Sequence, residues 1–134
     1  MVISLFYQTM DNCIFCKIVA GQSPCYKVYE DKNYLAFLDI APRTNGDTIL
    51  IPKKHYRWVY DVEDFSGYWQ AALKITKKMK EVLKPLFVSY FTYGLDVAHA
   101  HIHIMPRSET ETKFSQEIKK IPKEEMEEIA KKLF

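Results

Sequence analysis

Short segments in which apolar and polar residues alternate recur along the chain and predict strands. Residues 25–30 (CYKVYE) alternate, and residues 34–40 (YLAFLDI) follow after the turn EDKN, so the two segments predict a hairpin. After the loop APRTNGD, residues 48–52 (TILIP) predict a buried strand that ends at its proline. Residues 86–93 (LFVSYFTY) predict a further strand.

Three other segments have the spacing of a helix. Residues 13–20 predict one or two helical turns, and a longer helix is expected from about Asp61 to Lys84, just before Pro85. Its predicted apolar face consists of Phe65, Trp69, Leu73, Met79, Val82 and Leu83. Residues 122–134 predict a C-terminal helix with an apolar stripe of Met126, Ile129, Ala130 and Leu133. Strands outnumber long helices, so the expected class is α+β with an antiparallel sheet.

Residues 98–106, AHAHIHIMP, contain three of the four histidines of the chain. On a strand, His99, His101 and His103 would share one face, and the apolar residues between them would face a core. Pro106 is expected to end this strand. Such a face could be plain solvent-exposed surface, a metal site, a pH switch or a nucleophile with its supporting groups. A single metal fits poorly, because neighbours on one strand face lie about 6.6–7 Å apart.

Composition narrows the class of protein. The chain has 134 residues and a net charge of +2, which fits one domain and gives no basic surface of the kind that binds nucleic acid. No apolar run is long enough to span a membrane. Residues 1–10 lack the pattern of a signal peptide and are expected to be a short N-terminal extension. Three cysteines argue against a disulfide scaffold and favour a cytoplasmic location.

Cys13 and Cys16 form a CxxC pair that could be a redox motif, a metal site or two packed thiols. A zinc site needs four nitrogen or sulfur ligands. The remaining candidate ligands are His55, in IPKKH, and the histidines of residues 99–103.

Several segments in the same order resemble the histidine-triad (HIT) superfamily. They are CIFCKIVAG, YLAFLDIAP, TILIPKKH and HAHIHIMPR, which together extend from Cys13 to Arg107. The resemblance implies a HIT domain over residues 11–108, with residues 109–134 as a C-terminal helical extension of the same domain. It also implies an antiparallel sheet of about five strands with two main helices, a homodimer joined through a continuous sheet, and a purine nucleotide bound across the triad.

The resemblance assigns catalytic roles to the three histidines. It implies that His101 attacks an α-phosphate, that His103 donates to a phosphate oxygen, and that His99 supports the catalytic group. In the zinc-bearing branch of the superfamily, the matching positions Cys13, Cys16, His55 and His99 bind a structural zinc ion. His99 cannot use one nitrogen for both tasks, and we expect zinc to take it. No organic cofactor is expected.

The same resemblance implies a nucleotide pocket. Asp39 would accept hydrogen bonds from the ribose hydroxyls, although a turn residue is the alternative. The side chains expected to enclose the base, or simply to pack in the core, are Ile14, Phe15, Phe37 and Ile40.

Two departures from the superfamily pattern affect the chemistry. Asp47 stands where many members have a histidine, and the loop of residues 92–98 before the triad is short and lacks the usual glutamine and serine. Asp96 lies where a serine often serves the leaving group. An acid there could protonate a leaving group or repel phosphate.

The expected function is a nucleotide hydrolase that cleaves at an α-phosphate through a nucleotidyl-His101 intermediate. Its substrate would be a nucleoside phosphoramidate, an aminoacyl adenylate or a dinucleoside polyphosphate. The alternatives are a non-catalytic scaffold that binds zinc and nucleotide, and a pH- or metal-sensing module.

Overall fold

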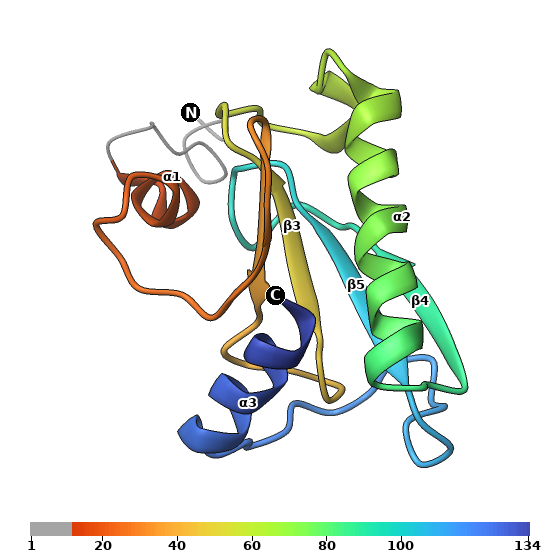
Figure 1. The fold of residues 1–134 in the computed structure, drawn as a ribbon. Helices are drawn as coiled ribbons and strands as arrows, with labels where there is room; N and C mark the ends of the chain where they lie inside the picture. The colour runs from red at the N-terminus through yellow and green to blue at the C-terminus, as the bar shows by residue number, and fades with distance from the viewer. Residues whose placement is uncertain (1–11) are drawn as a thin grey trace.

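A five-stranded antiparallel sheet forms the centre of the computed structural model, which describes residues 12–134 (Figure 1). The strands, β1 (Lys27–Glu30), β2 (Tyr34–Leu38), β3 (Thr48–Pro52), β4 (Phe87–Phe91) and β5 (Ile102–Arg107), are arranged in the order β1-β2-β3-β5-β4. The helices are α1 (Ile14–Val19), α2 (Phe65–Val82) and α3 (Lys123–Leu133), with a short 3-10 helix, η3 (Val59–Asp61). The predicted α+β class is confirmed, whereas the extension at residues 1–10 lies outside the described residues.

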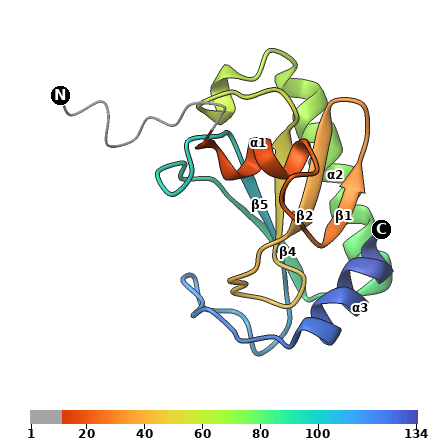
Figure 2. The ribbon, with the colours of Figure 1, turned by 90° about the vertical axis from the view of Figure 1, so that its left-hand side faces the viewer.

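Helices cover both faces of the sheet (Figure 2). Helices α2 and α3 pack on one face, where Leu50 and Ile102 lie in the main core. Helix α1 packs on the other face, where Phe15 contacts a second cluster that includes Phe37 and Ile51. Because both faces are covered, every residue of β2 and β3 is buried, and these strands have nearly continuous apolar sequences. No helix within residues 12–134 has the length and apolar character needed to cross a membrane.

Helix α2 forms where it was predicted, and Met79 of its predicted apolar face is buried, but the rest of that face is only partly buried or exposed. Its buried residues are Tyr68, Ala71, Ala72, Ile75, Thr76 and Met79. Phe65 and Leu73, predicted to be apolar core positions, are 46% and 42% exposed. The two alanines let the helix lie close to the sheet, and the Tyr68 hydroxyl donates to the Leu50 carbonyl at 2.8 Å. A tyrosine whose hydroxyl has a hydrogen-bond partner can therefore be fully buried, although its polar group is not favoured in a core.

The histidine segment follows the predicted alternation, although only part of it is a strand. Ala100, Ile102 and Ile104 are buried in the main core, as predicted. Strand β5 begins only at Ile102, because the Ala100 N–H donates to the Tyr56 carbonyl at 2.7 Å and not to a strand. His99 and His101 therefore precede the strand, which is a correction to the predicted boundary.

Pro106 lies inside β5 and does not end it, which is a second correction. Strand β3 pairs with β5 only as far as Ile104, whereas β4 continues beside it to Arg107. Pro106 therefore has strand β4 on one side only, an edge-like position in which a missing N–H is tolerated.

Helix α3 confirms the predicted C-terminal helix and its apolar stripe. Its four predicted apolar residues are all buried and join the main core. Glu124 and Glu125 lie in the first turn and Lys131 and Lys132 in the last, the arrangement that the helix dipole favours. The helix thus packs against the sheet, while the domain boundary at residue 108 stays a prediction.

Candidate functional site

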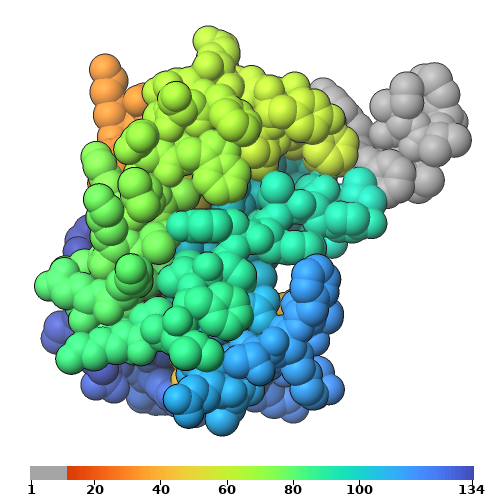
Figure 3. Space-filling view, turned by 90° about the vertical axis from the view of Figure 1, so that its right-hand side faces the viewer, coloured from red at the N-terminus to blue at the C-terminus, as the bar shows by residue number. Residues whose placement is uncertain are grey.

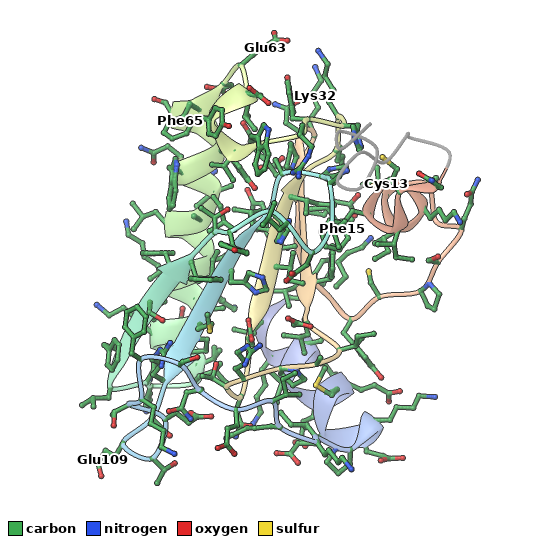
Figure 4. The ribbon with its side chains drawn as sticks, turned by 180° about the vertical axis from the view of Figure 1, so that it is seen from behind. Cys13, Phe15, Lys32, Glu63, Phe65 and Glu109 are labelled. Atoms are coloured by element: carbon green, nitrogen blue, oxygen red, sulfur yellow. The ribbon has the colours of Figure 1, made fainter. Side chains whose placement is uncertain are left out.

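Two cysteines and two histidines from distant parts of the chain meet at the start of α1. Cys13 is the N-cap of α1, and Cys16 lies in its first turn. The Cys13 Sγ atom lies 3.4 Å from His99 Nδ1, and the Cys16 Sγ atom lies 3.2 Å from His55 Nδ1. The four possible ligand atoms lie within 4.8 Å of one another. The structure therefore brings together all four residues predicted to bind zinc. Figure 4 shows Cys13 where α1 lies beside the sheet.

His99 presents its Nδ1 atom to both cysteines. Its Nε2 atom lies 2.9 Å from the Pro52 carbonyl oxygen, which can only accept, so Nε2 carries the proton. Burial is the main cause that lowers the pKa of His99 to about 4, and the ring is neutral. A neutral ring protonated on Nε2 has its lone pair on Nδ1, as a metal ligand needs. His99 thus presents its unprotonated Nδ1 atom to both cysteines.

The donor set matches a zinc site in its chemistry. Two sulfur and two nitrogen donors are a common set for tetrahedral structural zinc. Burial, and after it the neighbouring Cys13 thiol, raises the pKa of Cys16 to about 12. A metal ion would have to displace protons from the thiols on binding. Cys25 lies outside this cluster.

His101 is held in the opposite tautomer. Its Nδ1 atom lies 2.8 Å from the His99 carbonyl oxygen, so Nδ1 carries the proton and Nε2 keeps a lone pair. Burial lowers the pKa of His101, which keeps the ring neutral near pH 7. The Phe15 ring packs edge-on against it, with centroids 5.3 Å apart. The arrangement suits a nucleophilic nitrogen, since an unprotonated imidazole nitrogen can attack phosphorus.

His103 lies beside His101 but in a different electrostatic environment. The two ring centroids are 5.4 Å apart. Burial alone would lower the pKa of His103, but the contact with Asp47 and the charges of Asp47, Asp39 and Asp96 raise it overall. Its Nδ1 atom lies 3.5 Å from Asp47 Oδ1 and 3.8 Å from Asp39 Oδ2. A neutral histidine therefore stands next to one that is favoured as a cation.

Asp47 is a site residue to which sequence reasoning gave no role. The side chain is buried, with Oδ2 accepting from the Arg43 N–H at 3.0 Å and Oδ1 facing His103. Its position could have been inferred from register, because Ile49 pairs with His103 across β3 and β5. Asp47, two residues before Ile49, then lies on the same face as His103.

The predicted nucleotide-pocket residues are brought only partly together. Phe15 and Phe37 are buried and pack edge to face at 5.5 Å, which agrees with a core role as well as with a pocket wall. Asp39 lies beside His103, and its Oδ1 atom accepts from the Ala41 N–H at 2.9 Å, a turn contact. Ile14 and Ile40 are exposed, Ile40 by 83%, so a bound molecule could cover them.

Asp96 is close enough for its charge to act on both catalytic candidates. Its charge partly opposes the lowering of the His101 pKa by burial, and it is a minor cause of the raised pKa of His103. The loop that carries Asp96 is tied to the triad, because the Thr92 hydroxyl donates to the His101 carbonyl at 2.8 Å.

A family model and several relatives point to the same protein family. A family model described as HIT domain matches residues 20–110, which include His55 and the triad but begin after Cys16. A Bacillus subtilis protein named Protein hit is 42% identical over 104 residues, 72% of this chain and 72% of that protein. A Schizosaccharomyces pombe protein named adenosine 5'-monophosphoramidase hnt1 is 36% identical over 105 residues, 75% of this chain and 77% of that protein. An Arabidopsis thaliana protein named adenylylsulfatase HINT3 is 33% identical over 117 residues, 80% of this chain and 58% of that protein.

Solved structures agree with the sequence relatives. A Hit-like protein from Bartonella henselae, described as involved in cell-cycle regulation, has a TM-score of 0.78 at 32% identity, covering 92% of this chain and 95% of that one. A zinc-bound histidine triad family protein from Mycobacterium smegmatis has a TM-score of 0.74 at 29% identity, covering 93% and 92%. The fold, the triad and the matched residues agree, and this chain belongs to the HIT domain family.

Proposed function

We propose that the protein is a nucleotide hydrolase that cleaves at an α-phosphate of a purine nucleotide, such as a nucleoside phosphoramidate or a dinucleoside polyphosphate, and releases a nucleoside monophosphate. One observation carries the proposal: the His99 carbonyl fixes the proton on His101 Nδ1 and leaves the Nε2 lone pair free. The relatives named adenosine 5'-monophosphoramidase and adenylylsulfatase support this class of reaction.

The reaction has two displacements. In the first, His101 Nε2 forms a bond to the α-phosphorus as the bond to the leaving group breaks, and the leaving group takes its proton from solvent water. In the second, water attacks the same phosphorus and gives up a proton to solvent, the bond to His101 breaks with its electron pair returning to Nε2, and the monophosphate departs. Cationic His103 donates to a non-bridging phosphate oxygen and stabilises the charge that develops there. We assign the leaving-group side to Asp96, whose charge acts on both His101 and His103.

The nucleoside lies on the His103 side of the triad. Asp39 lies beside His103 and accepts hydrogen bonds from the ribose hydroxyls. Its Oδ1 atom is used by the Ala41 N–H, so Oδ2 is the oxygen that meets the ribose. The base lies against Phe15 and Phe37 and covers the exposed side chains of Ile14 and Ile40. Burial of these apolar surfaces on binding contributes affinity with little discrimination among purines.

Zinc has a structural role in this proposal. Cys13, Cys16, His55 and His99 would hold it, and the ion would fix α1 to the segment that carries His101. The zinc-bound relative from Mycobacterium smegmatis supports the assignment. A cytoplasmic location, where thiols stay reduced, suits such a site.

A homodimer is also part of the proposal. Strand β4 is an edge strand of the sheet, and its unpaired edge offers hydrogen-bonding groups to a second copy. Beside it, α2 presents Phe65 and Leu73, and Trp69 contacts Tyr90 of β4 at a centroid distance of 5.7 Å. Figure 3 shows α2 and β4 side by side on this surface. Pairing of two such surfaces would continue the sheet from one copy into the other.

A second candidate function is a non-catalytic protein that binds zinc and nucleotide. The short loop of residues 92–98, which lacks the glutamine and serine usual in the superfamily, favours it. In addition, His101 is only 3% exposed, which is little surface for a residue that must meet a substrate.

The test compares the protein with His101→Ala on AMP phosphoramidate and on diadenosine tetraphosphate, following AMP release by chromatography. We expect release by the wild type and a loss of roughly a thousandfold or more in the variant, because the nucleophile is removed. Circular dichroism and zinc content serve as controls for the fold of the variant. Nucleotide binding without release by the wild type would favour the binding protein.

A further inference from the structure

Arg57 has one hydrogen-bond donor that no residue uses. Its Nη1 atom donates to the Gly94 carbonyl at 2.8 Å, and its Cζ atom lies 3.6 Å from the centroid of the Trp58 ring. Its Nη2 atom is buried and has no hydrogen-bond partner among residues 12–134. Burying a donor without a partner costs about 1–3 kcal/mol, and such an atom in a folded protein calls for an explanation.

Arg57 and Trp58 hold the short loop before the triad. Gly94 has a φ of +88°, and a Cβ atom built there would lie 2.8 Å from the Trp58 ring. The loop therefore approaches Trp58 as closely as a glycine allows. Trp58 itself stacks on Tyr60, with centroids 6.0 Å apart and ring planes 5° apart. The guanidinium is thus fixed on one face by Trp58 and at one end by the loop.

Two contacts bring Arg57 close to His101. The Ala100 N–H, next to His101, donates to the carbonyl of Tyr56, the neighbour of Arg57, at 2.7 Å. The loop that Arg57 holds at Gly94 is tied to His101 by the Thr92 hydroxyl, which donates to the His101 carbonyl at 2.8 Å. Asp39 lies instead beside His103, 3.8 Å from its Nδ1 atom. With the ribose at Asp39 and the α-phosphate at His101, the group that leaves the phosphorus would lie toward the loop and Arg57.

We propose that Arg57 binds an oxyanion of the leaving group through Nη2, so that the protein prefers substrates whose leaving group is a phosphate or sulfate over those that release an uncharged amine. The inference rests on the proposed function and names its substrate class. Arginine is always charged and presents planar donors that match oxyanions. Arg57 would supply a hydrogen-bond donor in place of the glutamine and serine that the short loop lacks, and its charge would balance that of Asp96.

The test measures binding by calorimetry, without turnover. The probes are AMP and α,β-methylene-ADP, which adds a second anionic group that cannot be cleaved from the first. Arg57→Met should weaken binding of α,β-methylene-ADP about tenfold or more, the value of a hydrogen bond to a charged group, and binding of AMP less than about threefold. Arg57→Lys keeps the charge and should retain part of the preference. Lys54→Met removes an exposed cation that pairs with Glu63 and should leave both affinities unchanged.

Turnover gives the second arm. In Arg57→Met, kcat/KM should fall about tenfold or more for diadenosine tetraphosphate and adenylyl sulfate, and change little for an AMP phosphoramidate with an uncharged amine. The two oxyanion substrates distinguish phosphate from sulfate as the preferred group. An equal loss for all substrates and both probes would show that Arg57 only holds the loop, and no loss would show that it has no role; either result overturns the inference.

The binding arm separates the two proposals. If the wild type binds nucleotides without releasing AMP, the hydrolase proposal fails, and the affinity ratio still decides the role of Arg57. If the wild type binds neither probe, both proposals fail. Zinc content and circular dichroism confirm that Arg57→Met and Arg57→Lys are folded.

Discussion

Backbone carbonyls set the proton positions of two histidines that are two residues apart. The Pro52 carbonyl accepts a hydrogen bond from His99 Nε2–H, and the His99 carbonyl accepts one from His101 Nδ1–H. One ring therefore turns Nδ1 toward the cysteines, and the other keeps Nε2 for a substrate. The two histidines acquire different chemistry because the carbonyl groups that accept their hydrogen bonds lie in different parts of the fold.

At the residue scale, Asp47→Asn tests how His103 keeps its proton. Asp47, Asp39, Asp96 and His101 are the titratable groups that act on or contact His103, and the contact with Asp47 is the largest of the causes that raise its pKa. Because the folded pKa is raised, protonated His103 contributes stability below its unfolded pKa of about 6.5, and the contribution is lost as pH rises through the folded value.

The Asn variant lowers the pKa of His103, so kcat/KM should decline at lower pH than in the wild type. Near neutral pH the loss should be roughly tenfold, because a charged donor to phosphate becomes neutral. The pH profile of kcat/KM and the NMR titration of His103 measure the shift. Asp31→Asn, in the β1–β2 turn, is the control. An unchanged profile in Asp47→Asn would show that the carboxylate does not set the charge of His103.

The candidate site could be predicted from the sequence only in part. Cys13, Cys16, His55 and His99 were predicted as one cluster from resemblance, and the structure brings them together. Arg57 was missed because its role depends on two contacts, with Trp58 and with Gly94, and the second spans 37 residues. No local pattern contains information about such a contact.

At the scale of elements, the stability of α1 depends on its contacts with the rest of the fold. A helix of six residues is too short to be stable alone, and α1 is held by Phe15 in the second core cluster and by the cysteines at its start. A metal ion between α1 and His99 would link this helix to the catalytic segment. Loss of the ion should therefore affect both stability and the geometry at His101.

Cys13→Ser tests this link. Zinc content should fall from about one ion per chain to well below half, because one of four ligands is replaced by a poorer one. The melting temperature should fall with it. Cys25→Ser is the matched control, since Cys25 lies outside the cluster. Elemental analysis and a thermal melt measure both effects, and undiminished zinc in Cys13→Ser would refute the assignment.

The elements themselves were largely predictable, but the start of β5 and the buried face of α2 were not. Alternation placed Ala100, Ile102 and Ile104 in the core, although Tyr56 replaces a strand as the partner of Ala100. Helix α2 was expected to bury Phe65 and Leu73 and instead buries Tyr68 and two alanines. Periodicity identifies a helix, whereas the face it buries also depends on how closely the sheet lets it approach.

At the scale of the whole molecule, the surface formed by α2 and β4 is the proposed dimer interface. Leu73→Glu places a charge in it, which should convert a dimer into a monomer, because a buried unpaired carboxylate costs several kcal/mol. Ile118→Glu, an exposed position after β5, should leave the dimer intact. Light scattering gives the mass in solution. A monomeric wild type, or a dimeric Leu73→Glu, would contradict this interface.

The central claim is that the reaction has two displacements, with His101 attacking first. The most direct measurement is the stereochemical course at an α-phosphorus made chiral with sulfur and heavy oxygen. Each in-line displacement inverts the configuration, so attack by His101 followed by attack by water predicts net retention. Net inversion would mean that water attacks the substrate directly, and would contradict the role assigned to His101.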